Sequence, residues 1–151
     1  MQVDYSETVK YSRETLWKAL LDPKVLARLI PGIEKFDEVS PDKYAVTARL
    51  GLPSVRGVYS GIVEISEKNE PSSYRLRGDG KGTQGWAKGD VLITLTVAEN
   101  DTKVNIKAHA SVGGPIVGVG QRMMEGITKS MARDFFKALD SELNAAKAGN
   151  Q

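Results

Sequence analysis

The chain has 151 residues, no cysteine, one histidine and a formal net charge of +2. Without cysteine it can form no disulfide, thiolate metal site or cysteine nucleophile. Lysine and arginine are spread along the sequence instead of gathering in the basic stripe of a nucleic-acid-binding surface. The amino terminus has no signal-peptide pattern, and no apolar run approaches the length of a membrane span. We therefore expect a single cytoplasmic domain over residues 1–151.

The chain is expected to begin with one strand and two short helices. Apolar and polar residues alternate from Val3 to Tyr11, which indicates a strand. Ser12 is suited to cap a helix N-terminus. Asp22 is then suited to cap a second helix, with Pro23 at the first helical position. The pair Pro31-Gly32 ends this second helix.

From residue 33 to residue 112 the apolar pattern has a period of two, which is typical of strands. Short turns rich in Gly, Pro, Asn and Asp separate the runs, so neighbouring strands are expected to be antiparallel. The break at Gly51-Leu52-Pro53 indicates a loop or a bulge. The predicted strands are 33–39, 43–50, 54–67, 72–80, 83–98 and 103–112.

The segment from Gly113 to Leu143 predicts one long helix. Apolar residues recur at steps of three and four after Pro115, which indicates an amphipathic helix. At about 1.5 Å per residue it would be about 45 Å long. Residues 145–151 are expected to form a frayed tail. The apolar stripe consists of Ile116, Val119, Met123, Ile127, Met131, Phe135, Leu139 and Leu143.

These elements fit an α+β helix-grip fold. A strongly curved antiparallel sheet of seven strands wraps around the long C-terminal helix, and the two short helices fill the gap between the first and second strands. Helices held on one face of an antiparallel sheet are one of the standard layer arrangements of a single domain.

Strand parity and the long helix together predict an internal cavity. Many inward positions of the middle strands are Gly or Ala, whereas a core of normal density needs bulk there. The helix contributes methionines, which suit irregular apolar cavities. Alternatively, the glycines let the strands bend or the helix approach closely. The predicted ligand-binding residues are Glu7, Trp17, Val46, Ala48, Leu50, Tyr59, Gly61, Leu76, Ala87, Ile93, Ile106, Ala108, Met123, Met124, Ile127 and Met131.

Two residues leave alternatives open. Glu7 is a charged residue on the inward parity of the first strand, so it is either a polar contact for a ligand or a strand-end residue in solvent. Trp86 has outward parity beside Lys88. It is either exposed, where it would suit contact with a membrane or a partner, or returned to the interior by a bulge.

No catalytic or metal-binding motif stands out. His109 lies between two alanines on outward parity, so a solvated strand histidine is expected rather than a triad member or a zinc ligand. The run Gly78–Thr83, placed between two strands, matches no phosphate-binding pattern. We assign no catalytic residue, cofactor or metal ligand. Two alternatives stay open: an enzyme that uses Glu7, Tyr59 or Tyr74 as proton donor or acceptor, and an interaction module with a filled core.

Several short motifs are spread over residues 3–143: Trp17, Asp22-Pro23, Leu29–Gly32, Gly57–Gly61, Gly80–Gly89, Val112–Gly114 and Phe135-Phe136. In combination they resemble the G-subunit family of carbon monoxide dehydrogenase, within the START-like, Bet v 1-like (SRPBCC) superfamily. The resemblance implies a helix-grip fold around an apolar cavity that takes lipids, sterols, quinones or other hydrophobic ligands.

The function expected from these observations is non-enzymatic binding of a hydrophobic small molecule, a lipid or an isoprenoid quinone. The resemblance implies that the protein is an accessory factor for a molybdenum hydroxylase such as carbon monoxide dehydrogenase. It also implies a peripheral position at the inner face of the membrane. Longer family members carry a C-terminal extension suited to anchoring.

Overall fold

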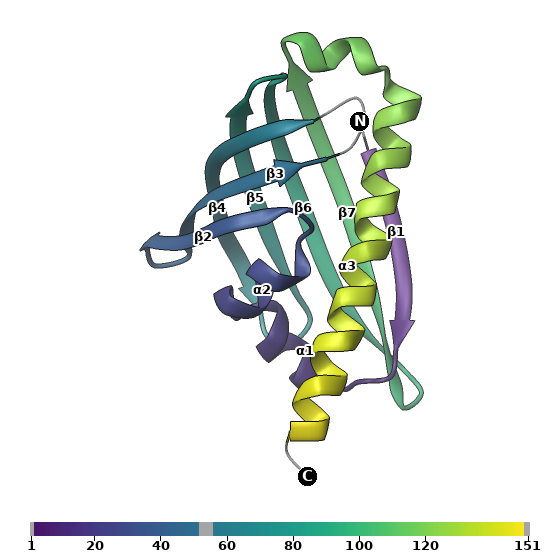
Figure 1. The fold of residues 1–151 in the computed structure, drawn as a ribbon. Helices are drawn as coiled ribbons and strands as arrows, with labels where there is room; N and C mark the ends of the chain where they lie inside the picture. The colour runs from purple at the N-terminus through teal and green to yellow at the C-terminus, as the bar shows by residue number, and fades with distance from the viewer. Residues whose placement is uncertain (1, 52–55, 150–151) are drawn as a thin grey trace.

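One curved antiparallel sheet and one long helix dominate the structure, a computed structural model that describes residues 2–51 and 56–149 (Figure 1). The described strands are β1 (Gln2–Val9), β2 (Ile33–Ser40), β3 (Lys43–Leu50), β4 (Gly57–Asn69), β5 (Ser73–Gly82), β6 (Gly85–Ala98) and β7 (Asp101–Gly113). The helices are α1 (Arg13–Leu20), α2 (Pro23–Leu29), the short 3-10 helix η1 (Pro115–Val119) and α3 (Gln121–Gly149).

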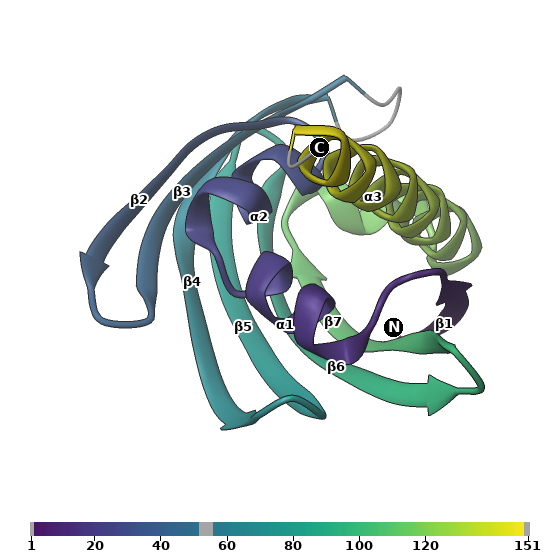
Figure 2. The same cartoon turned by 90° about the horizontal axis from the view of Figure 1, so that it is seen from below.

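The seven strands form a single sheet in the order β1-β7-β6-β5-β4-β3-β2. Successive strands from β2 to β7 are therefore neighbours, and β1 pairs with β7 at the far edge. Seen from below, the sheet curves around α1, α2 and α3 (Figure 2). Helix α3 packs against β1 and α2. The predicted α+β helix-grip fold, with two short helices between the first and second strands, is confirmed.

The two short helices begin where their capping residues predict. The Ser12 side chain accepts a hydrogen bond from the backbone N–H of Thr15 at 3.2 Å. The Asp22 carboxylate accepts one from the backbone N–H of Lys24 at 3.0 Å, and Pro23 is the first residue of α2. Each cap satisfies an N–H group that has no partner within its own helix.

The long helix begins later than its apolar stripe predicts. Residues Pro115–Val119 form η1, and Gly120 then adopts a φ of 90°, which ends the first element before α3 starts. Ile116 and Val119 therefore do not belong to α3, so the predicted single helix from Gly113 is wrong over its first turns. At the other end α3 continues to Gly149, beyond the point where the frayed tail is expected.

The strand predictions need two further corrections. Residues Gly78–Gly82 lie within β5 and not between strands, because their backbones pair with β4 and β6, and the turn falls at Thr83-Gln84. Strand β4 begins at Gly57. The expected start at residue 54 and most of the expected loop at Gly51-Leu52-Pro53 lie outside the described residues.

The packed core lies toward the end of the sheet covered by α1, α2 and the C-terminal half of α3. One row of paired inward residues runs Tyr74, Ile93, Ile106 and Tyr5 across four strands. The helices add apolar side chains to it, of which Leu16, Leu20, Leu26, Leu29, Phe136, Leu139 and Leu143 are buried.

Tyr74 is the largest fully buried side chain of this core. Its hydroxyl donates a hydrogen bond of 3.0 Å to the backbone carbonyl of Leu20, at the end of α1. Its ring meets that of Trp17 edge to face, with 5.7 Å between the centroids. Burial raises the pKa of the Tyr74 phenol, which therefore stays protonated and serves as a donor. These contacts fix α1 on the concave face of β5.

Candidate ligand-binding site

Away from the packed core, the inward-facing side chains of the middle strands become smaller. One row pairs Val46, Gly61, Gly80, Ala87 and Val112 across β3 to β7. The next pairs Tyr44, Val63, Gly78, Gly89 and Ala110. In both rows the middle strands carry only glycine, alanine or valine, so less side-chain volume covers the concave face there than over the core.

A hollow of about 370 Å³ lies over these two rows, and we call it the concave hollow. Its residues come from β3, β4, β5, β6 and β7, with Ile30 at the end of α2. They are Ile30, Val46, Ala48, Tyr59, Ser60, Gly61, Val63, Leu76, Gly78, Asp79, Gly80, Ala87, Lys88, Gly89, Val91 and Ala110.

The inner surface of the concave hollow is almost entirely apolar. Ser60, Asp79 and Lys88 alternate with the inward residues, so their side chains belong to the outer face of the sheet. Asp79 and Lys88 also line a recess on that outer face. Tyr59 is inward-facing, and burial raises the pKa of its phenol.

Gly82 makes room for the Tyr59 ring. The two residues pair directly across β4 and β5. A Cβ atom at Gly82 would lie 2.5 Å from Cδ1 of Tyr59 and 2.5 Å from the carbonyl oxygen of Val58. Any larger residue at position 82 would therefore have to displace both the ring and the strand backbone. The ring lies across this glycine at the border of the concave hollow.

Six residues of the predicted lining come together in the concave hollow. They are Val46, Ala48, Tyr59, Gly61, Leu76 and Ala87. Strand parity is the sequence signal that places them on one surface. The same parity includes further lining residues that the predicted set omitted, namely Val63, Gly78, Gly80, Gly89, Val91 and Ala110. Ile30 has no comparable signal, because its position depends on how α2 packs.

Several predicted lining residues of the sheet and short helices lie elsewhere. Trp17 and Ile93 are buried in the packed core, and Ile106 packs against it. Ala108 shares a row with Val91 but is among the residues of an outer-face recess.

Glu7 is exposed and lies in a groove between β1 and α3. This position matches the alternative of a strand-end residue in solvent. Its groove partners include Phe136, Lys137 and Asp140.

The four predicted residues of α3 also lie outside the lining of the concave hollow. Met131 borders a separate recess of about 230 Å³ together with Leu50, another predicted residue. Met123 is 53% exposed, and Met124 and Ile127 are half-buried. The physical reason is that α3 packs on β1 and α2 instead of lying over the middle strands.

Trp86 keeps its outward parity. Its pairing with Lys81 on β5 and Gly113 on β7 continues without a bulge, and the side chain is 40% exposed. A Cβ atom at Gly113 would lie 2.2 Å from Cε2 of Trp86, so the ring lies against this glycine. The Lys88 ammonium is 5.9 Å from the ring centroid. The structure thus favours the exposed alternative.

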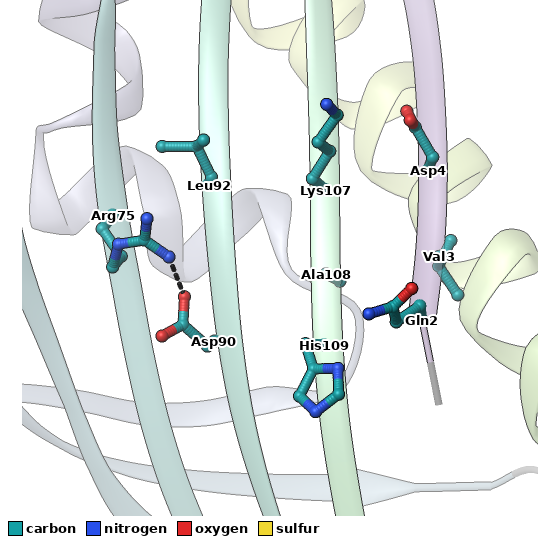
Figure 3. Close-up of a pocket in the computed structure, with 9 residues that line it drawn as sticks. All are labelled: Gln2, Val3, Asp4, Arg75, Asp90, Leu92, Lys107, Ala108 and His109. Atoms are coloured by element: carbon teal, nitrogen blue, oxygen red, sulfur yellow. Dashed lines mark hydrogen bonds and ion pairs between the residues drawn. The ribbon is translucent and has the colours of Figure 1, made fainter.

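The outer face of the sheet carries a larger recess, of about 790 Å³, but its chemistry is mixed (Figure 3). Arg75, Lys107 and His109 lie there beside Asp4 and Asp90. Asp90 is paired with Arg75 and, at 3.0 Å, with Arg77. These hydrogen bonds, that of Arg75 first, lower the pKa of Asp90.

Within residues 2–51 and 56–149, no cluster of three or more His, Asp or Glu side chains could hold a metal ion. In the same part of the chain, no helix has both the length and the hydropathy needed to cross a bilayer.

The family model of the carbon monoxide dehydrogenase G-subunit (CoxG) matches residues 6–144. The chain belongs to the CoxG family. A solved structure of a conserved protein from Geobacillus kaustophilus is similar to this CoxG chain, with a TM-score of 0.93, 30% identity and 97% of each chain covered. No curated protein matches the CoxG chain.

Two more distant structures share the fold of the CoxG chain. A START superfamily protein from Mycobacterium smegmatis has a TM-score of 0.75 at 14% identity, covering 96% of this chain and 98% of its own. Ara h 8.0201 has a TM-score of 0.71 at 18% identity, with the same coverage of both chains. At these identities the similarity concerns the fold alone, which is the START-like, Bet v 1-like helix-grip fold.

Proposed function

We propose that this CoxG-family protein binds a hydrophobic small molecule, a lipid or an isoprenoid quinone, in the concave hollow without transforming it. The observation that carries the proposal is the apolar lining of a hollow formed where glycine and alanine replace bulky core residues. Its volume of about 370 Å³ falls within the usual range for small-molecule sites. Transfer of apolar ligand surface from water would supply the binding free energy.

The state of α3 supports the same proposal. From residue 117 to residue 135 no side chain is buried, although the segment includes Met124, Ile127, Met131 and Phe135. The helix lies on the concave side of the sheet (Figure 2). A ligand with a chain longer than the concave hollow would extend from it along this incompletely buried stripe. We therefore propose that the predicted ligand contacts on α3 touch the part of a long ligand that extends beyond the concave hollow.

The positions of the titratable candidates favour binding over catalysis. An enzyme on this scaffold would need two or more such groups to converge in one cavity. Tyr59 lies at the concave hollow, Tyr74 in the packed core, and Glu7 in the groove between β1 and α3. This separation supports a non-enzymatic role for the concave hollow.

The accessory role is part of the proposal and is supported by membership of the CoxG family. We propose a molybdenum hydroxylase such as carbon monoxide dehydrogenase as the partner, met in the cytoplasm at the inner face of the membrane. Gel filtration of this protein with a purified carbon monoxide dehydrogenase tests the partnership. Co-elution is expected, and separate elution at micromolar concentrations of both proteins would count against it.

A hollow-filling variant tests the binding site. A Cβ atom at Gly89 would meet no atom within 4 Å, so the side chain introduced by Gly89→Val starts in open space and adds volume to the concave hollow. Ser111→Val is the matched control, because Ser111 is exposed on the outer face of the neighbouring strand β7. Both variants are checked for folding by thermal melting.

The probe is decylubiquinone, with binding followed by isothermal titration calorimetry. We expect Gly89→Val to weaken binding about tenfold, which corresponds to about 1.4 kcal/mol, and Ser111→Val to leave the Kd within about twofold of wild type. The site assignment is overturned if Gly89→Val folds normally and binds as tightly as wild type. If neither decylubiquinone nor 1-dodecanol binds the wild-type protein, the proposed function itself is overturned.

A further inference from the structure

We infer that one end of the molecule docks on an anionic lipid bilayer and so brings the concave hollow to the membrane surface. This end consists of residues 81–88 around the β5–β6 turn and residues 113–123 around η1, and we call it the η1 end. Its elements lie together at the top of Figure 1. The inference rests on the peripheral membrane position in the proposed function, and it names the surface and the lipid charge that this position uses.

Backbone contacts hold η1 beside the β5–β6 turn. The N–H of Ile116 donates a hydrogen bond of 2.6 Å to the carbonyl of Gln84 in that turn. The Trp86 ring lies against Gly113, two residues before η1 begins. The start of β6, the end of β7 and η1 therefore meet at one end of the sheet.

Large apolar side chains are exposed at the η1 end. Trp86 is 40% exposed, Val117 56% and Met123 53%. An indole ring suits the interfacial region of a bilayer, where its apolar body is buried and its N–H stays hydrated. Ala87, the chain neighbour of Trp86, lines the concave hollow. The exposed apolar surface therefore borders the proposed ligand site.

Cations accompany these apolar side chains. The η1 end contains Lys81, Lys88 and Arg122, all exposed, and its sequence includes no Asp or Glu. The Lys88 ammonium is 5.9 Å from the centroid of the Trp86 ring. Asp79, just outside the η1 end, pairs with Lys88 across β5 and β6 and offsets part of the charge. The remaining excess of positive charge is complementary to anionic lipid headgroups.

The strand connections at the other end of the sheet have the opposite charge. Each contains one acidic residue and no Lys or Arg; they are the turns 41–42, 70–72 and 99–100. Lys68 pairs with Asp42, so the charge of the first turn is neutralised locally. Glu70 and Glu99 are exposed. An anionic bilayer would attract the η1 end and repel these two turns, which favours the orientation that we infer.

Sedimentation with sucrose-loaded vesicles tests the inference. The vesicles consist of phosphatidylcholine, alone or with about 30 mol% phosphatidylglycerol. Lys81→Gln is compared with Lys103→Gln, because both lysines are exposed on the outer face and lie toward opposite ends of the sheet. Val117→Ser is compared with Val97→Ser, because Val97 is 57% exposed near the end of β6 away from η1. Thermal melting checks that each variant folds.

We expect the wild-type protein to bind the anionic vesicles at least about tenfold more tightly than the neutral ones. Lys81→Gln should weaken binding to anionic vesicles about fivefold, the usual effect of one cation near such a surface. Val117→Ser should weaken it about threefold through lost apolar burial. Lys103→Gln and Val97→Ser should each change it by less than about twofold.

The two tryptophans give an independent readout of the orientation. Trp86 is exposed at the η1 end, whereas Trp17 is buried in the packed core. Anionic vesicles that contain brominated phosphatidylcholine should therefore quench the fluorescence of the wild-type protein. They should leave the fluorescence of Trp86→Phe unchanged, because that variant keeps only Trp17.

The outcomes separate this inference from the proposed function. Equal binding to neutral and anionic vesicles, equal losses in the η1-end variants and their controls, or unquenched Trp86 would overturn the docking surface. Absence of vesicle binding by a protein that binds decylubiquinone would overturn it too and leave the ligand site in place. If Lys81→Gln abolishes co-elution with carbon monoxide dehydrogenase and no vesicle binds, the η1 end serves a protein partner and the inference is wrong. If the vesicles bind as expected but neither decylubiquinone nor 1-dodecanol does, the docking surface is supported and the proposed ligand binding is overturned.

Discussion

Two tyrosines on the concave face of the sheet lie in different environments. Tyr74 on β5 is fully buried, and its hydroxyl is engaged with the carbonyl of Leu20. Tyr59 on the neighbouring strand β4 is half-buried at the border of the concave hollow. The environments of the two rings differ: α1 covers Tyr74, whereas among the described residues the lining around Tyr59 takes only Ile30, next to the end of α2, from outside the sheet.

Removing the Tyr74 hydroxyl should destabilise the protein. In Tyr74→Phe the Leu20 carbonyl loses its donor in a water-excluded core, so we expect the free energy of unfolding to fall by about 1–2 kcal/mol. Urea denaturation followed by circular dichroism measures this change. Tyr5→Phe, which removes a hydroxyl from a half-buried ring beside Phe136, should cost less than about 0.5 kcal/mol. If Tyr74→Phe has the same free energy of unfolding as wild type, the hydrogen bond from Tyr74 to Leu20 makes no net contribution to stability.

Parity in the sequence places both tyrosines on the inward face, and the structure agrees. Parity alone does not distinguish the two tyrosines, because the hydrogen bond from Tyr74 to Leu20 depends on where α1 packs on the sheet. The same limit applies to Trp17 and Ile93. Their sequence pattern marks them as inward-facing, but only tertiary packing places them in the core and not at the concave hollow.

At the scale of elements, α3 is one helix with two different environments. Its C-terminal half buries Phe136, Leu139 and Leu143. An ion pair between Arg28 of α2 and Glu142 also joins this half to the rest of the protein. The N-terminal half has no buried side chain. Helix α3 is thus held mainly through its C-terminal half.

Gly120 and Gly126, near the N-terminal end of α3, allow a matched comparison of how a glycine-to-alanine substitution changes the free energy of unfolding. A Cβ atom at either Gly120 or Gly126 would meet no other atom within 4 Å. Gly126 lies inside α3, so Gly126→Ala should stabilise the protein by about 0.5–1 kcal/mol. Gly120 has a φ of 90°, so Gly120→Ala should destabilise it by about 1–3 kcal/mol. Thermal and urea unfolding of both variants measure the difference; changes of the same sign would contradict the assigned backbone conformation.

Capping chemistry predicts helix starts better than apolar spacing does in this chain. Ser12 and Asp22 mark the starts of α1 and α2 because each side chain directly satisfies a backbone N–H. The start of α3 carries no such cap signal. Ile116 and Val119 continue the helical spacing across Gly120, so periodicity alone predicts an unbroken helix where the backbone has a break.

At the scale of the whole molecule, packing is uneven from one end to the other. Rows of bulky residues lie under α1, α2 and the C-terminal half of α3, and rows rich in glycine line the concave hollow. The inward pattern of small residues predicts this hollow from sequence. It does not predict the course of α3, which depends on tertiary contacts such as that between the rings of Tyr5 and Phe136.

This unevenness should appear in amide hydrogen exchange. We expect residues 121–134 of α3 to exchange at least about tenfold faster than residues 136–143, because opening their helical turns exposes little buried apolar surface. Exchange followed by mass spectrometry under native conditions gives the comparison within one helix. Equal protection of the two segments would show that α3 opens only as a unit, contrary to the uneven packing.

The glycine-rich rows have a consequence for how this protein can diversify. Exchanging Gly89 for a larger residue reshapes the concave hollow and leaves the side chains around Tyr74 untouched, since the two groups lie on different rows of the same strands. Substitutions in the glycine-rich rows can thus change which ligands the protein prefers, while the packed core keeps its contribution to the free energy of unfolding. In the course of evolution, proteins with this architecture can therefore acquire a new ligand specificity through single substitutions.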